Sequence, residues 1–167
     1  MDHMWTCRCC GQQFTELPLS VGFDAPDPWH GLSDAERESR GLIGSDICTI
    51  DEHYFLRGCL DVPIVDRMAT IFSWSVWVSI SAQSFEHIKN VWDEDVRDGG
   101  PALFGWLCNS VPNYPETYAL RTHIHLRNYG VRPFIELEAT DHPLATEQRE
   151  GITMRRVEEI VAASLMH

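Results

Sequence analysis

The residues with the clearest chemical potential form a cysteine pair near the start of the chain. Cys7 and Cys10 are separated by two residues and followed by Gly11, which can relax a tight turn. Two thiolates at this spacing can bind one tetrahedral zinc ion, at about 2.3 Å from each sulfur. The pair is half of such a site, and the candidates for the other half are Cys48, Cys59, Cys108, His30 or another histidine.

Cys48 and Cys59 are 11 residues apart, on a turn and the strand that follows it, so they can converge, but neither belongs to a second C-x-x-C pair. Two other interpretations of the cysteines remain open. Free cysteine is among the residue types that are most often buried, so these thiols can simply belong to the core. A redox pair usually lies at a helix N-terminus, where the dipole lowers the pKa of a thiol, but the residues from Gly11 to Pro18 predict no helix.

Two histidine motifs and one arginine are further candidates. His123 and His125 would share one face of a strand and can bind a metal together, although charge pairing with a neighbouring strand explains them without a metal. Asp141 and His142 can form a carboxylate–imidazole pair for acid–base catalysis, although a turn that leads into a short helix explains the same residues. Arg57 is either an anion-binding group or a member of an ion pair. These residues support an alternative function, a small metal-dependent enzyme or hydrolase that uses His142, Asp141 and Arg57.

The charge of the chain limits its partners. Its 13 Lys and Arg residues and 25 Asp and Glu residues give a formal net charge of −12. The basic residues are scattered and do not form the stripe that a phosphate backbone requires, so we expect no nucleic-acid partner. Acidity of this size favours solubility, and it can also steer a basic protein partner to the surface.

Hydropathy and the first residues indicate a cytoplasmic protein with no membrane segment. Apolar residues make up 44% of the chain and charged residues 23%, as in a soluble globular domain. The longest apolar run, from Ile71 to Ile80, contains serines and is shorter than the ~20 residues that span a membrane. Met1 to Trp5 lacks the features of a secretory signal, so we expect the cysteines to be thiols or metal ligands.

Hydrophobic periodicity and capping residues predict the elements that position these candidates. The predicted elements are a helix at 33–40, strands at 54–64 and 72–80, a helix from Ser81 to about 96, an irregular stretch at 101–115, a hairpin around Tyr129-Gly130 and a helix from about Thr153. Ser33 and Glu36 form a capping box at the start of the first helix. In the first strand Arg57, Cys59 and Asp61 alternate with apolar residues and therefore share one face.

The hairpin has a predicted register. Apolar side chains of its two strands face each other only if the numbers of paired residues add up to an odd value, and a two-residue turn at Tyr129-Gly130 gives that register. The resulting pairs are Ile124 with Ile135, His123 with Glu136, and Arg121 with Glu138.

The order of the elements predicts an α+β fold. Strand pairs that do not alternate strictly with helices favour an antiparallel or mixed sheet of at least four strands, with helices packed mainly on one face. We expect residues 1–167 to form a single domain. Residues 1–32 are expected to be a loop-rich segment that carries the metal knuckle and packs on the α+β body.

Segments along nearly the whole chain resemble one known family. These segments are Cys7-x-x-Cys10-Gly11, Asp46-Ile47-Cys48-x-Ile50-Asp51, Phe55-Leu56-Arg57-Gly58-Cys59, Trp74-Ser75-Val76-Trp77-Val78-Ser79, Phe104-Gly105-Trp106-Leu107, Tyr114-Pro115-x-Thr117, Arg132-Pro133, His142-Pro143-Leu144-Ala145 and Gln148-Arg149-x-Gly151-Ile152. Together they resemble the bacterial domain-of-unknown-function family 2199. The resemblance implies no activity, substrate or catalytic residue. It includes all four predicted zinc ligands, whereas Cys9 and Cys108 look incidental, and relatives place a histidine near the position of Phe14.

These observations predict a non-enzymatic, acidic protein-binding module with a structural zinc bound by Cys7, Cys10, Cys48 and Cys59. An immunity-like role, in which the domain neutralises a basic toxin domain, is one concrete form of this function. The net charge, the lack of a catalytic constellation and Trp77, a candidate exposed aromatic residue on the serine face of its strand, support it.

Overall fold

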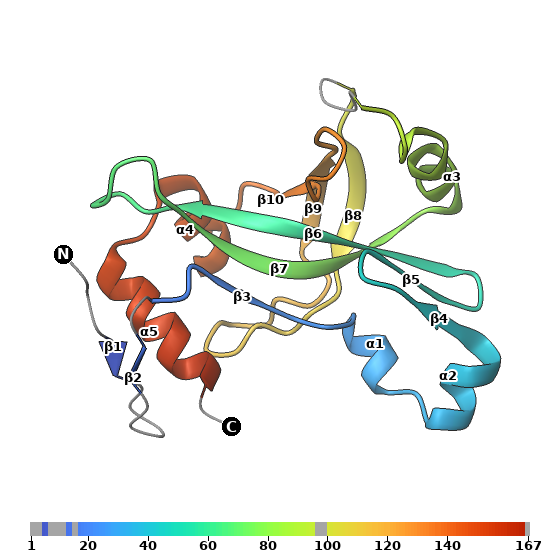
Figure 1. Cartoon of the computed structure of the whole chain (residues 1–167), viewed down its shortest axis with the longest axis horizontal. Helices are drawn as coiled ribbons and strands as arrows, with labels where there is room; N and C mark the ends of the chain where they lie inside the picture. Colours follow the sequence, from blue (N-terminus) through green and yellow to red (C-terminus); the bar gives the residue numbers. More distant parts are fainter. Residues whose placement is uncertain (1–4, 7–12, 15–16, 96–99, 166–167) are drawn as a thin grey trace.

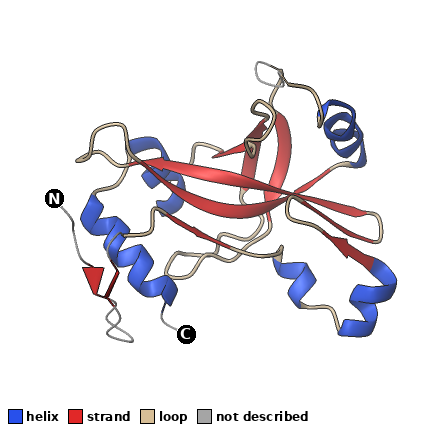
Figure 2. Cartoon of the chain, in the orientation of Figure 1, coloured by secondary structure: helices blue, strands red, loops and turns tan. Residues whose placement is uncertain are grey.

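The structure is a computed structural model that describes residues 5–6, 13–14, 17–95 and 100–165. Its elements, labelled in Figure 1, are β1 Trp5–Thr6, β2 Gln13–Phe14, β3 Ser20–Gly22, α1 Asp27–His30, α2 Asp34–Arg40, β4 Gly41–Ile43, β5 Ile47–Ile50, β6 His53–Pro63, β7 Ile71–Ile80, α3 Ala82–Val91, β8 Leu103–Leu107, β9 Arg121–His125, β10 Phe134–Leu137, α4 Pro143–Glu150 and α5 Met154–Leu165. Figure 2 shows how the helices surround the strands.

Eight of these strands form one mixed sheet that closes on itself. Their order is β3-β7-β8-β9-β10-β6-β5-β4, and β6 also pairs with β7, so the strands from β6 to β10 make a five-stranded barrel. Strand β3 extends the sheet beside β7, and β5 and β4 extend it beside β6. The long β6–β7 hairpin follows the predicted alternation: Leu56, Leu60 and Val62 point into the barrel core, and the polar residues between them face outwards.

The barrel closes where β10 lies parallel to β6. Phe134 pairs with Cys59, and the Cys59 amide donates a hydrogen bond to the Pro133 carbonyl oxygen at 2.8 Å. Gly58 makes this approach possible, because a Cβ atom there would lie 2.6 Å from the Ile135 side chain and 2.9 Å from the Pro133 carbonyl oxygen. A larger residue at position 58 would overlap with the neighbouring strand.

Trp77 is buried, so the prediction that it lines a groove or an exposed interface is wrong. Its side chain is 0% exposed and packs with Cys48, Phe55 and others into a second apolar cluster outside the barrel core. The indole Nε1 donates a hydrogen bond to the Phe23 carbonyl oxygen at 3.0 Å. The chain around Phe23 covers this face because β3 pairs with β7.

Asn109 fixes that covering segment to the barrel. This side chain is fully buried just after β8. Its Oδ1 accepts a hydrogen bond from the Trp77 amide at 2.8 Å, and its Nδ2 donates to the Ala25 carbonyl oxygen at 3.0 Å and to Asp27 Oδ1 at 3.2 Å. One amide side chain therefore joins the barrel wall to the segment that covers it.

The α+β fold and the mixed sheet are confirmed, but the arrangement of the helices differs from the prediction. Helices α4 and α5 lie at one end of the long hairpin, whereas α1 and α2 lie beside β4 and α3 lies apart from both groups (Figure 1). A closed barrel has no single open face on which all helices could gather. The predicted caps are present at Ser33 and Ser81. Within the described ranges, no helix has the length and apolar character to span a bilayer.

Candidate functional site

The register of β8, β9 and β10 builds a mixed aromatic and charged surface on the outside of the barrel. Two rows of residues cross these strands, namely Phe104, His123 and Glu136 in one row and Trp106, Arg121 and Glu138 in the other. Directly opposed residues on neighbouring strands point to the same side of a sheet. We call these six residues the β8–β10 face.

This face confirms the predicted register of the hairpin. Ile124 pairs with Ile135, and His123 pairs with Glu136. The turn is centred on Tyr129-Gly130, as predicted, and Gly130 has a φ of 87°, which favours glycine. The regular ladder ends at His125 and resumes at Phe134, so the loop is longer than the two residues of the turn.

The two aromatic side chains of the β8–β10 face are exposed. Phe104 is 39% and Trp106 43% exposed, and their rings meet edge to face with centroids 5.0 Å apart. The Arg121 guanidinium lies 5.5 Å from the first centroid and 5.4 Å from the second, and its Nε is 3.5 Å from Glu138 Oε2. These contacts restrain the side chains, so the surface is largely formed before any partner arrives.

The histidines of β9 take part in cross-strand contacts. His125 Nε2 lies 3.1 Å from Glu136 Oε1, and the His125 ring stacks on Phe134. These contacts agree with the charge-pairing interpretation for His125, and His123 lies opposite Glu136 in the ladder. In the part of the chain that the structure describes, no group of three or more His, Cys, Asp or Glu residues is placed to hold a metal ion.

Cys48 and Cys59 are not brought together. Cys48 lies opposite Phe55 in the β5–β6 ladder, and Phe55 precedes Cys59 by four residues on β6. At about 3.3 Å per residue this offset is roughly 13 Å, whereas two sulfur ligands of one zinc ion must lie within about 4 Å of each other. Burial also raises the pKa of the Cys48 thiol to about 11, so it stays protonated at neutral pH. Cys7 and Cys10 lie outside the described residues, and the zinc site that they anchor stays a prediction.

His142 lies at the N-terminus of α4, where it binds backbone groups through both ring nitrogens. Its Nδ1 accepts a hydrogen bond from the Leu144 amide at 3.1 Å, which places the ring proton on Nε2. That nitrogen lies 3.1 Å and 3.2 Å from the carbonyl oxygens of residues 115–116, to which it donates. Asp141 is exposed, and the contacts of Arg57 lie elsewhere, on the outer face of β6. The structure therefore does not assemble the three residues of the alternative enzyme.

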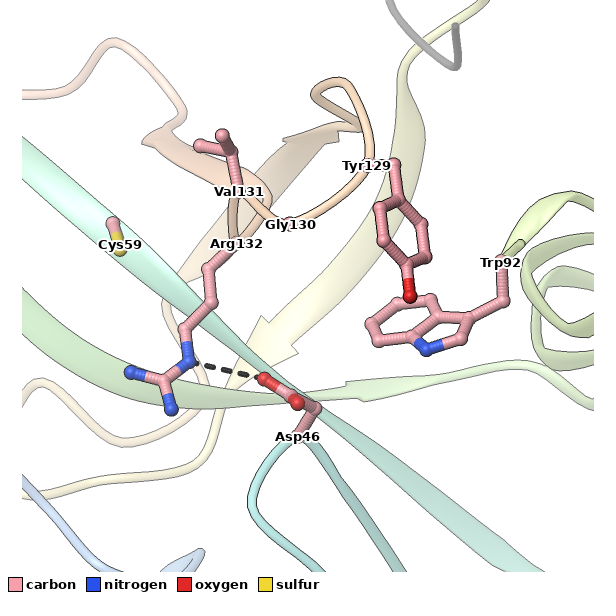
Figure 3. A pocket seen from close by; sticks show the side chains of 7 residues that line it. All are labelled: Asp46, Cys59, Trp92, Tyr129, Gly130, Val131 and Arg132. Atoms are coloured by element: carbon pink, nitrogen blue, oxygen red, sulfur yellow. Dashed lines mark hydrogen bonds and ion pairs between the residues drawn. The ribbon is translucent and has the colours of Figure 1, made fainter. Parts of the chain in front are cut away.

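A cleft lies between β6, the turn before β5, the end of α3 and the β9–β10 loop (Figure 3). Its volume is about 550 Å³, and it is lined by Asp46, Cys59, Trp92, Tyr129, Gly130, Val131 and Arg132. Arg132 Nε donates a hydrogen bond to Asp46 Oδ1 at 3.0 Å. The aromatic side chains of Trp92 and Tyr129 lie together on the opposite side of the cleft (Figure 3). We call this feature the Arg132 cleft.

Arg57 lies beside the cleft, two residues before Cys59 on the same face of β6. Its Nε donates a hydrogen bond to Ser75 Oγ at 2.8 Å, and its guanidinium carbon lies 5.7 Å from the centroid of the Trp77 ring. Burial is the main cause that lowers the pKa of Arg57, and the nearby Arg132 charge lowers it further. Among the described residues, no carboxylate forms an ion pair with Arg57.

Sequence reasoning missed β8 and, with it, the exposed aromatic residues. The expectation of an irregular stretch at 101–115 is wrong for Leu103–Leu107, which pairs with strands on both sides. A signal was present, because Phe104 and Trp106 alternate with smaller or aliphatic neighbours. The cleft gave no such signal, because Asp46 and Arg132 meet only through the closure of the barrel.

Comparison with known proteins places these features in a family without giving them a function. A family model described as an uncharacterised protein conserved in bacteria matches residues 6–152. No curated protein and no solved structure matched the chain. The matched range includes the β8–β10 face and the Arg132 cleft, and it confirms the resemblance found in the sequence motifs. The chain belongs to the bacterial domain-of-unknown-function family 2199.

Proposed function

We propose that this protein is a binding module for a basic protein partner, with the β8–β10 face as its binding surface. The observation that carries the proposal is the exposure of Phe104 and Trp106 on the wall of a closed barrel. Strand β8 is paired with β7 and β9 on both edges, so a partner cannot bind by adding a strand beside β8 and would contact these side chains from the outer face of the barrel. Aromatic residues and arginine are the residue types that most often supply binding energy at the centre of interfaces.

The charge of the chain supports a basic partner. The formal net charge is −12, and Glu136 on β10 and Glu138 directly after it lie on the same face as the aromatic residues, across strand β9. An acidic surface attracts basic proteins, repels acidic ones and speeds up association at low salt. A toxin domain neutralised by an immunity-like protein is one partner of this kind.

A structural zinc held by Cys7 and Cys10 remains part of the proposal, as a support of the fold and not of the binding surface. The alternative, a small metal-dependent enzyme, has less support. His142 is occupied by backbone hydrogen bonds at both ring nitrogens, so it has no lone pair available to accept a proton from a substrate.

The test compares three forms of the chain: the wild type, Trp106→Ala and Met68→Ala. Met68 is 95% exposed between β6 and β7, so its replacement is a matched control for the loss of an exposed apolar side chain. We expect the wild type and Met68→Ala to retain the same basic protein from a bacterial lysate. With that protein purified, Trp106→Ala should bind it at least about 30-fold more weakly, which corresponds to about 2 kcal/mol for a central interface residue.

The association rate of the purified pair, measured by stopped flow, should fall as the salt concentration rises. Circular dichroism of Trp106→Ala establishes that the variant is folded. The proposal fails if no protein is retained specifically, if Trp106→Ala binds as well as the wild type, or if the association rate does not depend on salt.

A further inference from the structure

The Arg132 cleft, which is separate from the β8–β10 face, brings two arginine side chains close to one aspartate. Arg57 and Arg132 both meet Asp46. The Arg57 amide donates a hydrogen bond to the Asp46 carbonyl oxygen at 2.8 Å, and Arg132 Nε donates to the Asp46 carboxylate at 3.0 Å. Guanidinium groups stay protonated in proteins, so both arginines bring a positive charge to this place.

Arg57 is the less well compensated of the two arginines. Its side-chain contacts are a hydroxyl group, a backbone carbonyl oxygen and the Trp77 ring, all of which are neutral. Asp24 and Asp46 attract it from beyond ion-pair distance, and the repulsion from Arg132 exceeds the attraction of either. A partly buried charge without an ionic partner is costly, and a bound anion would remove that cost.

We infer that the Arg132 cleft binds a small molecule that carries a carboxylate or phosphate group, with the oxyanion held between Arg57 and Arg132. Arg132 donates to Asp46 through Nε, and within the described ranges its two terminal nitrogens make no hydrogen bond. Those nitrogens have the geometry that binds the paired oxygens of a carboxylate or a phosphate. The volume of about 550 Å³ is that of an ordinary small-molecule site.

Trp92 and Tyr129 indicate what the rest of this ligand is. Their side chains line the cleft on the side opposite Arg132 (Figure 3). Aromatic walls bind apolar or planar groups, while a few polar side chains fix the orientation of the ligand. The ligand class is therefore an oxyanion attached to a planar or apolar body, such as an aromatic carboxylate or an aryl phosphate.

Titrations followed by heteronuclear NMR test the site with three probes at constant ionic strength, namely inorganic phosphate, phenyl phosphate and benzoate, with sodium chloride as the control. We expect saturable shifts of the Asp46, Cys59 and Gly130 amides, with tighter binding of an aromatic probe than of inorganic phosphate. Saturation by only one aromatic probe supports the site and assigns its ligand as a phosphate or a carboxylate. The inference is overturned if these amides show no saturable shift with any probe, or the same shift with chloride.

Variants separate this site from general charge effects. Arg57→Gln and Arg132→Gln should each weaken probe binding about tenfold, the size expected for losing a hydrogen bond to a charged group. Arg155→Gln is the matched control, because Arg155 is exposed on α5. If Arg57→Gln does not fold, Arg57→Lys keeps the charge without the forked geometry and should still weaken binding. Undiminished binding in the Arg57 and Arg132 variants refutes the site, while Trp106→Ala should bind the probes as the wild type does.

Discussion

Replacing Asn109 by alanine tests whether one buried side chain fixes residues 17–32 to the barrel. The Asn109 side chain makes three hydrogen bonds, with the Trp77 amide, the Ala25 carbonyl oxygen and Asp27 Oδ1. In the variant the two backbone groups stay buried without their partner. A lost hydrogen bond of this kind costs about 1 kcal/mol, and more where the remaining group cannot reach water, so the expected loss is about 3 kcal/mol. That is a large share of the stability of an ordinary domain.

Urea unfolding followed by far-UV circular dichroism measures this loss. With a slope of about 2 kcal/mol per molar urea, a change of about 3 kcal/mol lowers the midpoint by about 1.5 M. Asn90→Ala is the matched control, because Asn90 is exposed on α3 and its replacement should leave the midpoint nearly unchanged. A destabilisation of Asn109→Ala below about 1 kcal/mol would refute the reasoning, because the buried backbone groups would then have found other partners.

Three further predictions concern the barrel closure and the cysteines. Gly58→Ala should lower the free energy of unfolding by about 1–3 kcal/mol, because the added Cβ atom overlaps with the Ile135 side chain. Gly44→Ala is the control, because position 44 has room for a Cβ atom and the free energy of unfolding should not change. Equal losses of stability for the two variants in urea unfolding would count against the barrel closure described here. Cys48 should escape alkylation in the folded protein at mildly alkaline pH, because it is buried and its pKa is raised to about 11, so that the reactive thiolate forms only near that pH. Mass spectrometry of the labelled protein checks this, and rapid labelling of Cys48 without unfolding would contradict it. Metal analysis should find zinc that Cys7→Ser loses and Cys48→Ser keeps, because the Cys48 thiol is fully buried in an apolar cluster; zinc lost in both variants, with both folded, would show that Cys48 is a ligand after all.

Local signals in the sequence predicted local structure well. The capping box at Ser33 and the cap at Ser81 depend on residues three positions apart, and both helices begin where these residues place them. The β9–β10 register follows from the turn at Tyr129-Gly130, because a short turn leaves few ways to pair the strands. The candidate residues whose neighbours are local, such as His123 and Arg121, therefore had correctly predicted partners.

The features that the sequence did not predict depend on contacts between segments that are far apart in the chain. Alternation placed Trp77 on the correct face of β7, but it could not show that residues 17–32 cover that face. No short turn connects β10 to β6, so their parallel pairing leaves no local signal in the sequence, and an open sheet was expected. Arg132 reaches Asp46 only because of that pairing, which is why the cleft could not be predicted while Arg57 could be named as an anion-binding candidate.

Asn109 and β10 lie in the second half of the sequence, and this order has a consequence for folding during synthesis on the ribosome. The segment that covers Trp77 is not fixed to the barrel until Asn109 has been synthesised, and the barrel interior stays open until Phe134–Leu137 follows. Contacts between residues so far apart in sequence form slowly, because a long loop must close before they contribute. The nascent chain therefore exposes apolar surface through most of its synthesis, which makes it a natural client for chaperones that bind emerging polypeptides.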